Sequence, residues 1–297
     1  MTSSDHLESM AQMLEATEDY RVVRRLKPRS PIVPPPGTPV RLGLVVDVET
    51  TGLDPRRDEI IELAMTPFRY GLDGAVFSVG ESFQGLRQPS EPITPEITAI
   101  TGITNEMVAG QVIDPAAVAE FAAPASLIIA HNAAFDRRFL ERFSDVFSTK
   151  AWACSLSQID WAAEGFEGAK LAYLAQATGF FYDRHRAKHD CLATVELLAT
   201  KLPRSGVTAL SRLLDSARGV TWRIWAENSP FDLKDTLKAR GYRWNGDPGP
   251  EPRAWYIDVP EVQREDEVRF LRTEIYRREV DPLVRRIDAY DRFSDRI

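Results

Sequence analysis

Two acidic residues stand one position apart at the end of an apolar run, in the stretch "VVDVETTGLDP" at residues 45–55. Residues two apart in a strand point to the same face, so Asp47 and Glu49 should converge at the carboxyl end of a buried strand, where ligands of open α/β sheets usually bind. Adjacent buried carboxylates repel each other, and with oxygen ligands alone the ions that stabilise them are Mg²⁺ or Mn²⁺. The structural alternative is that Glu49 is a solvated loop acid and Asp47 a turn residue.

Two further acids have similar settings. The stretch "HNAAFDRRFL" places Asp136 one turn into a helix that follows a buried strand, and "HRAKHDCLAT" places Asp190 near the apolar side of another helix. An unpaired carboxylate in such a place costs several kcal/mol. A salt bridge to Arg137, Arg138 or Lys188 is the structural explanation for either acid. Four acids at strand ends and helix starts favour a metal site instead.

These residues carry a resemblance to the DEDDh 3′-to-5′ exonucleases of the ribonuclease H-like superfamily, typified by the proofreading subunit of bacterial replicative polymerases. The family's motif Asp-x-Glu-Thr-Thr-Gly is matched at residues 47–52, Asn-x-x-Phe/Tyr-Asp at residues 132–136 and His-x4-Asp at residues 185–190. The resemblance covers roughly residues 40–203. It implies a mixed sheet flanked by helices and an enzyme that releases nucleoside monophosphates from the 3′ ends of DNA.

The resemblance also implies a role for each catalytic residue. In phosphodiester hydrolysis, two ions about 4 Å apart can clamp the attacking and the leaving oxygen. By resemblance, Asp47 bridges both ions, Glu49 and Asp190 bind the ion that carries the attacking water, and Asp136 holds the second ion. His185 takes the proton from that water, since imidazole titrates near the working pH.

Several residues around the motifs are expected to contact the substrate. In the family, the positions of Thr51 and Leu53 contact the terminal nucleotide, with the apolar side chain wedged beside the last base, and Phe135 lines that pocket. Each of these could equally be ordinary packing. The full expected set is Thr50, Thr51, Leu53, Gly102, Ile103, Asn132 and Phe135, with Gly102 and Ile103 taken from the segment "ITPEITAITGIT".

Two other histidines lie near the motifs. His189 follows His185 by four residues, and such a pair on a helix can hold zinc. The family spacing selects His185, so His189 is expected to be a partly buried polar neighbour. His131 is expected to support the site or to pack at the end of its strand.

Composition limits the other function classes. The chain has 297 residues and a net charge of −7, so it has no general attraction for nucleic acid and needs local basic patches or bound cations. Its two cysteines, Cys154 and Cys191, suit buried thiols in a reducing compartment. No apolar stretch reaches the roughly 20 residues that span a bilayer, and the polar start is unlike a signal peptide. We therefore expect a cytoplasmic protein without membrane contact.

The elements that position the acids follow from hydrophobic patterning. Strands are predicted over 41–48, 59–70 and 75–86, with a hairpin turn at 71–74, and a short buried strand over 126–132. Helices are predicted over 5–26, 94–103, 114–123, 133–143, 155–165, 170–179 and 187–202. Three strands followed by alternating strands and helices predict a mixed α/β sheet with helices on its faces.

The chain is expected to divide into three parts: an amino-terminal helix and proline-rich linker (1–38), the exonuclease domain (39–204) and a small α+β accessory domain (205–297). The last part is predicted to contain strands over 219–226, 241–245 and 254–259, a turn at 246–252, a helix capped by Ser229 and a long amphipathic helix. It shows no catalytic constellation.

The accessory part could bind single strands or a protein partner. Lys234, Lys238, Arg240 and Arg243 could face phosphates while Tyr242 or Trp244 stacks on bases. Alternatively, the tryptophans form a hydrophobic core and the cations a solvated face.

The expected function is thus a two-metal 3′-to-5′ exonuclease that uses Mg²⁺ or Mn²⁺ and acts on single-stranded 3′ ends, on DNA in preference to RNA. The alternatives are an exoribonuclease, because only contacts to the 2′-hydroxyl distinguish the two backbones, and a non-catalytic nucleic-acid-binding protein on this scaffold. The sequence leaves the pathway and the oligomeric state open.

Overall fold

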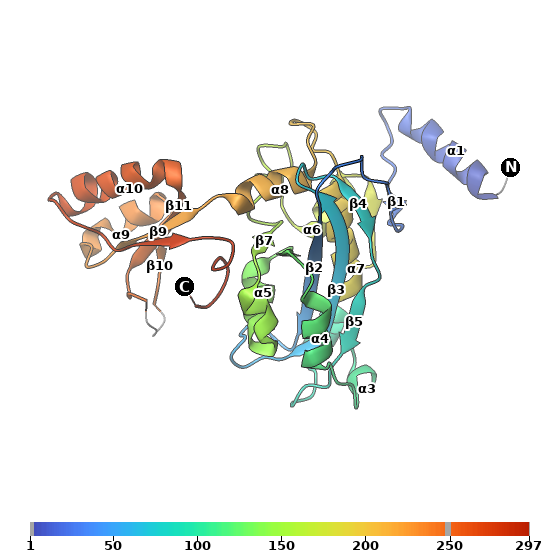
Figure 1. The fold of residues 1–297 in the computed structure, drawn as a ribbon, viewed down its shortest axis with the longest axis horizontal. Coiled ribbons are helices and arrows are strands. Elements are labelled where there is room, and N and C mark those ends of the chain that lie inside the picture. The colour runs from blue at the N-terminus through green and yellow to red at the C-terminus, as the bar shows by residue number, and fades with distance from the viewer. Residues whose placement is uncertain (1–2, 247–250, 297) are drawn as a thin grey trace.

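The computed structural model describes residues 3–246 and 251–296. Its larger sheet has the strand order β4-β3-β2-β6-β7, with β5 also paired to β3 (Figure 1). β2 runs antiparallel to β3 and parallel to β6, which is parallel to β7. The strands are β2 (Val40–Thr50), β3 (Ile60–Gly71), β4 (Val76–Val79), β5 (Phe83–Leu86), β6 (Leu127–Ala130) and β7 (Trp152–Cys154).

Helices cover both faces of this sheet. Val45 on β2 belongs to the apolar cluster that α6, α7 and α8 complete, whereas Leu44 and Val46 belong to the cluster that α4 and α5 complete. β2 is therefore buried on both faces, and its odd-numbered residues point towards α7. This confirms the expected mixed sheet flanked by helices. The helices are α2 (Pro95–Thr101), α3 (Asn105–Val108), α4 (Pro115–Ala122), α5 (Ala133–Phe143), α6 (Leu171–Ala177), α7 (Ala187–Ala199) and α8 (Ala209–Arg218), with a 3₁₀ turn at Asp145–Thr149.

The predicted strand over residues 75–86 is two strands. Val79 pairs with Phe68 and Phe83 pairs with Met65, so the later strand carries one extra residue between these pairs. Pro67 lies opposite this point and has no N–H to donate, while its carbonyl accepts from the Gly80 N–H at 2.8 Å. The break therefore follows from a proline inside β3.

The predicted helix over residues 155–165 is a series of turns. Its buried side chains, Ile159 and Trp161, are two residues apart, which is not a helical spacing. The indole of Trp161 donates to the Ser155 carbonyl at 2.9 Å, and Gln158 accepts from the Cys154 N–H at 2.8 Å. These side-chain contacts with the backbone replace the helical ladder.

The predicted helix over residues 5–26 ends early, since α1 spans Ser3–Glu15. Further along, β1 (Arg24–Arg25) pairs in parallel with β8 (Phe180–Phe181). The Arg24 N–H donates to the Gly179 carbonyl at 2.9 Å, so this part of the chain is extended along the body. Figure 1 shows α1 projecting from the body at the end opposite the small sheet.

The smaller sheet has the order β10-β11-β9-β12, and every pair in it is antiparallel. Helices pack on one face, around Ile224, Ile257 and Val284, which are aligned across three strands. The predicted turn at 246–252 lies largely outside the described residues. The elements are β9 (Thr221–Ala226), β10 (Arg243–Trp244), β11 (Trp255–Pro260), β12 (Val284–Ile287), 3₁₀ turns at Phe231–Leu233 and Glu261–Gln263, α9 (Lys234–Ala239), α10 (Arg264–Phe270) and a π-helical turn at Leu271–Tyr276.

α8, which patterning did not predict, connects the two sheets (Figure 1). Leu210, Leu213 and Leu214 on α8 lie in the apolar cluster of the larger sheet. This packing favours placing the end of the first domain after Arg218 rather than at residue 204.

The chain returns to the larger sheet after β12. The Trp152 N–H on β7 donates to the Ala289 carbonyl at 2.7 Å, and Phe293 packs against the cluster beneath α5. We call residues 288–296 the C-terminal tail. None of the helices among the described residues has the length and apolar composition needed to span a bilayer.

Candidate active site

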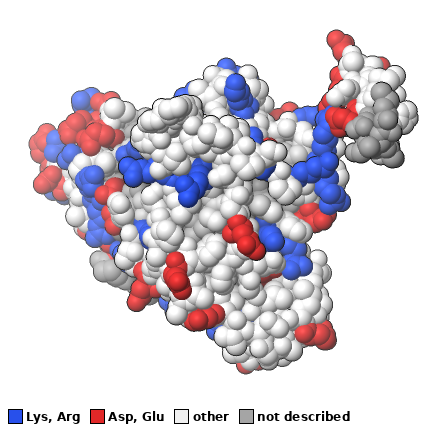
Figure 2. Space-filling model, turned by 45° about the vertical axis from the view of Figure 1, so that its right-hand side comes forward, with Lys and Arg blue, Asp and Glu red and all other residues white. Residues whose placement is uncertain are grey.

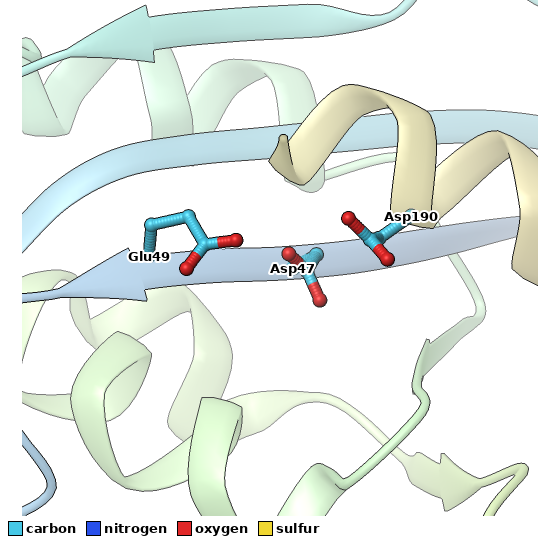
Figure 3. A group of neighbouring side chains, drawn as sticks. All are labelled: Asp47, Glu49 and Asp190. Carbon is cyan, nitrogen blue, oxygen red and sulfur yellow. The ribbon is translucent and has the colours of Figure 1, made fainter. Parts of the chain in front are cut away.

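The site is built on the last residues of strand β2 and the first turn of helix α7. One oxygen from each of Asp47, Glu49 and Asp190 lies within 4.8 Å of the other two. Figure 3 shows Asp47 facing Asp190, with Glu49 further along β2. The period of two along β2 aims both of its acids at α7, as the sequence predicted.

The fourth acid approaches from α5. Asp136 is 4% exposed, and its Oδ1 accepts from the Val48 N–H at 3.2 Å. Its charge is the leading electrostatic cause of the raised pKa of Asp47. The structure thus brings the four predicted acids, from three elements, into one electrostatic cluster.

Burial raises the pKa of every acid in this cluster, and repulsion from neighbouring acids raises it further at Asp47, Glu49 and Asp136. The pKa of Asp47 is well above its usual range because of burial and the charges of Asp136, Asp190 and Glu49. Burial, reinforced by Asp190, raises the pKa of Glu49 to about 8. Burial raises the pKa of Asp136 to about 7, against the opposing hydrogen bond from Val48. Acids held together at this cost are characteristic of functional sites.

The donor set fits a divalent cation. The clustered ligands are carboxylate oxygens, which hard cations such as Mg²⁺ and Mn²⁺ prefer. None of the described arginines or lysines forms an ion pair with Asp47, Glu49, Asp136 or Asp190, so the salt bridges considered for Asp136 and Asp190 do not form. The negative charge of the site is left for a bound ion to neutralise.

His185 lies in the loop before α7. It is exposed, and its backbone has a φ of 61°, a left-handed conformation that is uncommon for residues other than glycine. A charge on His185 is among the causes that lower the pKa of Asp190, so the imidazole is near that carboxylate. The loop presents the ring to solvent beside the acids.

The other histidines have structural partners. His189 contacts the Asp183 carbonyl through Nδ1 at 3.1 Å. His131 contacts Ser155 Oγ at 2.9 Å and the Ala169 carbonyl at 2.8 Å, and burial lowers its pKa to about 4. Among the described residues, no metal-ligand group contains both His185 and His189.

Sequence reasoning missed a fifth acid. Glu62 on β3 lies opposite Glu49 in the strand register and is fully buried. It accepts from Arg186 Nη2 at 3.0 Å, from the Ala187 N–H at 3.0 Å and from Gln84 Nε2 at 2.7 Å. Glu62 therefore fixes the start of α7, between His185 and Asp190. The sequence signal for a supporting ion pair was an arginine, Arg186, directly after His185. The acid that pairs with Arg186 is Glu62, 124 residues away in the sequence.

A second missed contact comes from Tyr182, which precedes the His185 loop. Its hydroxyl donates to Asp190 Oδ1 at 2.9 Å. This bond and the Arg186 N–H to Asp190 Oδ2 at 3.2 Å orient the carboxylate. Outer contacts of this kind hold metal ligands in position.

The expected substrate residues fall into three groups. Leu53 is 82% exposed in the loop after β2, and Thr51, Asn132 and Phe135 also retain exposed surface. Thr50 is buried and donates to the Gly52 carbonyl at 2.6 Å, so it shapes the loop.

The last group is the turn after α2. Gly102 ends α2 with a φ of 69° and open space around its Cα. Ile103 is fully buried against Ile61, Ile93 and Val108. The side chain of Ile103 is therefore a core residue in this structure and not an accessible contact.

Both cysteines are buried and free, as expected. The thiol of Cys191 lies 3.5 Å from the carbonyls of Val45 and Ala64, and burial raises its pKa. Figure 2 shows basic and acidic side chains interspersed on the face it presents, with uncharged areas between them. On that face, attraction for a polyanion is local.

Comparison with known proteins supports this geometry. The sequence model of the exonuclease family RNase_T matches residues 44–198, just over half of the chain. The DNA polymerase III subunit epsilon of Aquifex aeolicus is 29% identical over 161 residues, which cover 52% of this chain and 77% of that protein. The DNA polymerase III subunit epsilon-like protein of Rhodobacter capsulatus is 33% identical over 191 residues, which cover 59% of this chain and 26% of the relative.

Other relatives are much longer than the matched segment. The PolC-type DNA polymerase III of Thermotoga maritima is 29% identical over 188 residues, which cover 57% of this chain but only 13% of the relative. Among solved structures, E. coli Exonuclease I in complex with a dA16 oligonucleotide has a TM-score of 0.51 at 17% identity, covering 79% of this chain and 71% of that chain. This likeness shows a shared fold.

Proposed function

Because the chain belongs to the exonuclease family RNase_T, we propose that it hydrolyses phosphodiester bonds from the 3′ end of DNA and releases nucleoside monophosphates. The observation that carries this proposal is the cluster of Asp47, Glu49 and Asp190, whose oxygens lie within 4.8 Å of one another and form no ion pair with a lysine or arginine of residues 3–246 and 251–296. The names of the relatives, subunits of DNA polymerase III, support DNA as the substrate.

The acids of the site hold two Mg²⁺ or Mn²⁺ ions in this proposal. Asp47, Glu49 and Asp190 bind one ion, and Asp47 and Asp136 bind the other. When bound, such ions lower the pKa of the attacking water and neutralise the leaving 3′-oxygen. The raised pKa values of Glu49 and Asp136 mean that ion binding also displaces protons from these carboxyls.

His185 acts as the general base and takes the proton from the attacking water. Its position in an exposed loop leaves the ring free to reach the substrate side of the cluster. The ion pair of Glu62 with Arg186 holds the backbone that follows His185 in place, so only the side chain of His185 has to move.

The terminal nucleotide lies against the loop after β2 and the start of α5. Leu53 contacts the last base, Thr51 and Asn132 offer polar contacts, and Phe135 lines the pocket. Gly102 leaves room for the strand because it presents no side chain. Thr50 positions this loop without touching the nucleotide.

We assign residues 39–218 and the C-terminal tail to the exonuclease domain and residues 219–287 to an accessory domain that binds nucleic acid or a protein partner. Tyr242 is 3% exposed and cannot stack on a base. Trp244 is 53% exposed and can. Arg240 and Arg243 already pair with Glu267 and Asp258, so Lys234 and Lys238 are the cations left from the predicted set.

The test is digestion of single-stranded, duplex and mismatched DNA and of RNA of the same sequence, each labelled at the 5′ end. We expect a ladder that shortens from the 3′ end with DNA and Mn²⁺ present. Cleavage of RNA in preference to DNA would identify an exoribonuclease. Release of no mononucleotide from any strand would leave only a binding role.

Variants separate the residue roles. Asp190→Asn should abolish both cleavage and metal binding, measured by calorimetry with Mn²⁺. His185→Asn, which tolerates the left-handed backbone, should abolish cleavage and keep metal affinity. Asp183→Asn is the matched control, because Asp183 is exposed in the same loop and pairs only with Arg25. Parental cleavage rates for His185→Asn would refute the general-base role.

A further inference from the structure

An open groove of about 670 Å³ lies beside the proposed nucleotide pocket. Its walls come from the loop between β2 and β3, from α5 and from the segment before α4. Phe139 in its lining packs on Phe135 with ring centroids 4.9 Å apart. The groove is therefore next to Phe135, which is proposed above to line the pocket for the terminal nucleotide.

Four arginines line this groove, and three of them give it its charge, because Arg87 pairs with Glu59. Arg56 and Arg57 belong to the loop after β2, and Arg142 lies on α5. All three are exposed, and none forms an ion pair with a described acidic side chain. In a protein of net charge −7, three unpaired guanidinium groups in one groove form a local basic patch of the kind that a polyanion needs.

The acids that face the groove are already engaged. Glu59 pairs with Arg87 at 2.9 Å and accepts from the Ser90 N–H at 2.7 Å. Asp58 accepts from the Asp54 N–H at 2.8 Å. Arg87 offsets the charge of Glu59, whereas Asp58 keeps its negative charge because its partners are neutral donors. Arg56, Arg57 and Arg142 outnumber Asp58, so the groove has a net positive charge.

The length of the groove suits a short run of nucleotides. Arg142 lies six residues after Asp136 on α5, which is about 9 Å along the helix axis. Nucleotides of one strand rise by about 3.4 Å each in a duplex, so this span covers roughly two or three of them. Arg142 thus lies about 9 Å from Asp136 along the axis of α5, a separation that two or three nucleotides of a strand would span.

We propose that this groove binds the two or three nucleotides preceding the scissile bond, through contacts of Arg56, Arg57 and Arg142 with backbone phosphates. The proposal rests on the function proposed above and names the part of the chain that holds the substrate strand. Phosphate contacts position the strand and carry no sequence preference.

The test compares two triple variants of the full chain. Arg56→Ala/Arg57→Ala/Arg142→Ala removes the groove charges. Arg41→Ala/Arg69→Ala/Lys201→Ala removes three exposed cations elsewhere on the same domain, two of them at the far end of β2 and β3. Both variants have the same net charge, so general electrostatic attraction changes equally.

The measurements are the KM for a long single-stranded oligonucleotide across a salt series and the hydrolysis of thymidine 5′-monophosphate p-nitrophenyl ester, which is too short to enter the groove. For the groove variant we expect a KM about tenfold higher or more and a salt slope reduced by about 2, at roughly 0.7 per phosphate contact. Ester hydrolysis should be unchanged, and the control variant should keep the parental salt slope.

An unchanged salt slope for the groove variant, or an equal loss in the control, would overturn the proposal. If the unaltered chain cleaves no strand, the proposed function fails. Binding by the groove is then tested separately by fluorescence anisotropy of a labelled oligonucleotide. If the groove variant binds the oligonucleotide as tightly as the unaltered chain, the groove proposal is wrong. A pair of partial variants, Arg56→Ala/Arg57→Ala and Arg142→Ala, should each give part of the reduction in slope.

Discussion

Two buried charged groups occupy consecutive positions on α5 and have opposite surroundings. Asp136 belongs to the carboxylate cluster, whose members repel one another. Arg137 is fully buried and donates to Glu141 at 2.7 Å and to the carbonyls of Arg292 and Tyr290 at 2.6 Å each. On the same helix, Asp136 is therefore a buried acid next to other acids, whereas the neighbouring Arg137 is a buried cation with hydrogen-bond acceptors for its donors.

This difference separates residues that bind an ion from residues that stabilise the fold. A buried cation with a full set of acceptors holds two parts of the fold together, here α5 and the C-terminal tail. A group of buried acids without cations is unfavourable until an ion binds, and it is retained because of what it binds. Substitutions in the two regions should consequently change different properties.

The largest effect is expected for Asp47→Asn. Cleavage should fall by about 10³-fold or more, equal to ~4 kcal/mol of transition-state stabilisation, because the residue proposed to bind both ions loses its charge. In EDTA, however, the melting temperature should rise, since one source of repulsion is removed. Kinetics and differential scanning calorimetry measure the two effects. A fall in melting temperature in EDTA would contradict the assignment of these acids as a mutually repelling cluster.

The opposite pattern is expected for Arg137→Met. The substitution removes the donor of the Arg292 carbonyl and the buried ion pair with Glu141, although Glu141 keeps its contacts with Ser294 and Arg296. Breaking a buried pair costs up to about 3–5 kcal/mol of unfolding free energy. Urea denaturation measures it, and metal affinity of the folded fraction should be retained. Arg269→Met is the control, because Arg269 and Asp266 are each 69% exposed and their pair contributes less than about 0.5 kcal/mol.

Glu62→Gln tests a residue that shares features of the acid cluster and of Arg137. Glu62 lies opposite Glu49 in the sheet, and it forms a buried ion pair with Arg186. We expect kcat to fall by roughly 10–100-fold with a small change in KM, because the start of α7 is no longer held. Arg186→Lys, which keeps the charge but loses the fork of donors, should have a smaller effect. A parental kcat for Glu62→Gln would show that Glu62 only fills the core.

The smallest effect is a change of stability with pH. The pKa values of about 8 for Glu49 and about 7 for Asp136 lie above those of the unfolded chain, so these groups bind protons more tightly in the folded state. Their contribution to stability is complete below about pH 4 and is lost as the pH rises through about 7 to 8. Melting temperatures in EDTA should therefore fall between about pH 5 and pH 8 more than with Mn²⁺. Equal slopes would mean that no ion neutralises the cluster.

The sequence predicted the parts of the site that depend on local geometry. Alternation along β2 aims Asp47 and Glu49 at one face, and the periodic pattern of residues 133–143 matches α5 at both ends. The Arg186 partner of Glu62 and the Tyr290 and Arg292 partners of Arg137 could not be predicted, because they are distant in sequence. Patterning also missed α8, and the resemblance gave no sign that the side chain of Ile103, expected to contact substrate, is buried, since tertiary packing decides which apolar residues a short turn buries.

The path of the C-terminal tail has a practical consequence for dissecting this protein. Since residues 288–296 add a carbonyl to the outer edge of β7 and accept from Arg137, the small four-stranded unit is inserted within the nuclease, not appended to it. Cutting the gene after Arg218 would also expose the outer edge of β7 and remove the Tyr290 and Arg292 carbonyls that accept from the buried guanidinium of Arg137. Excising the insert while rejoining α8 to the tail through a flexible peptide is the deletion that leaves the nuclease whole.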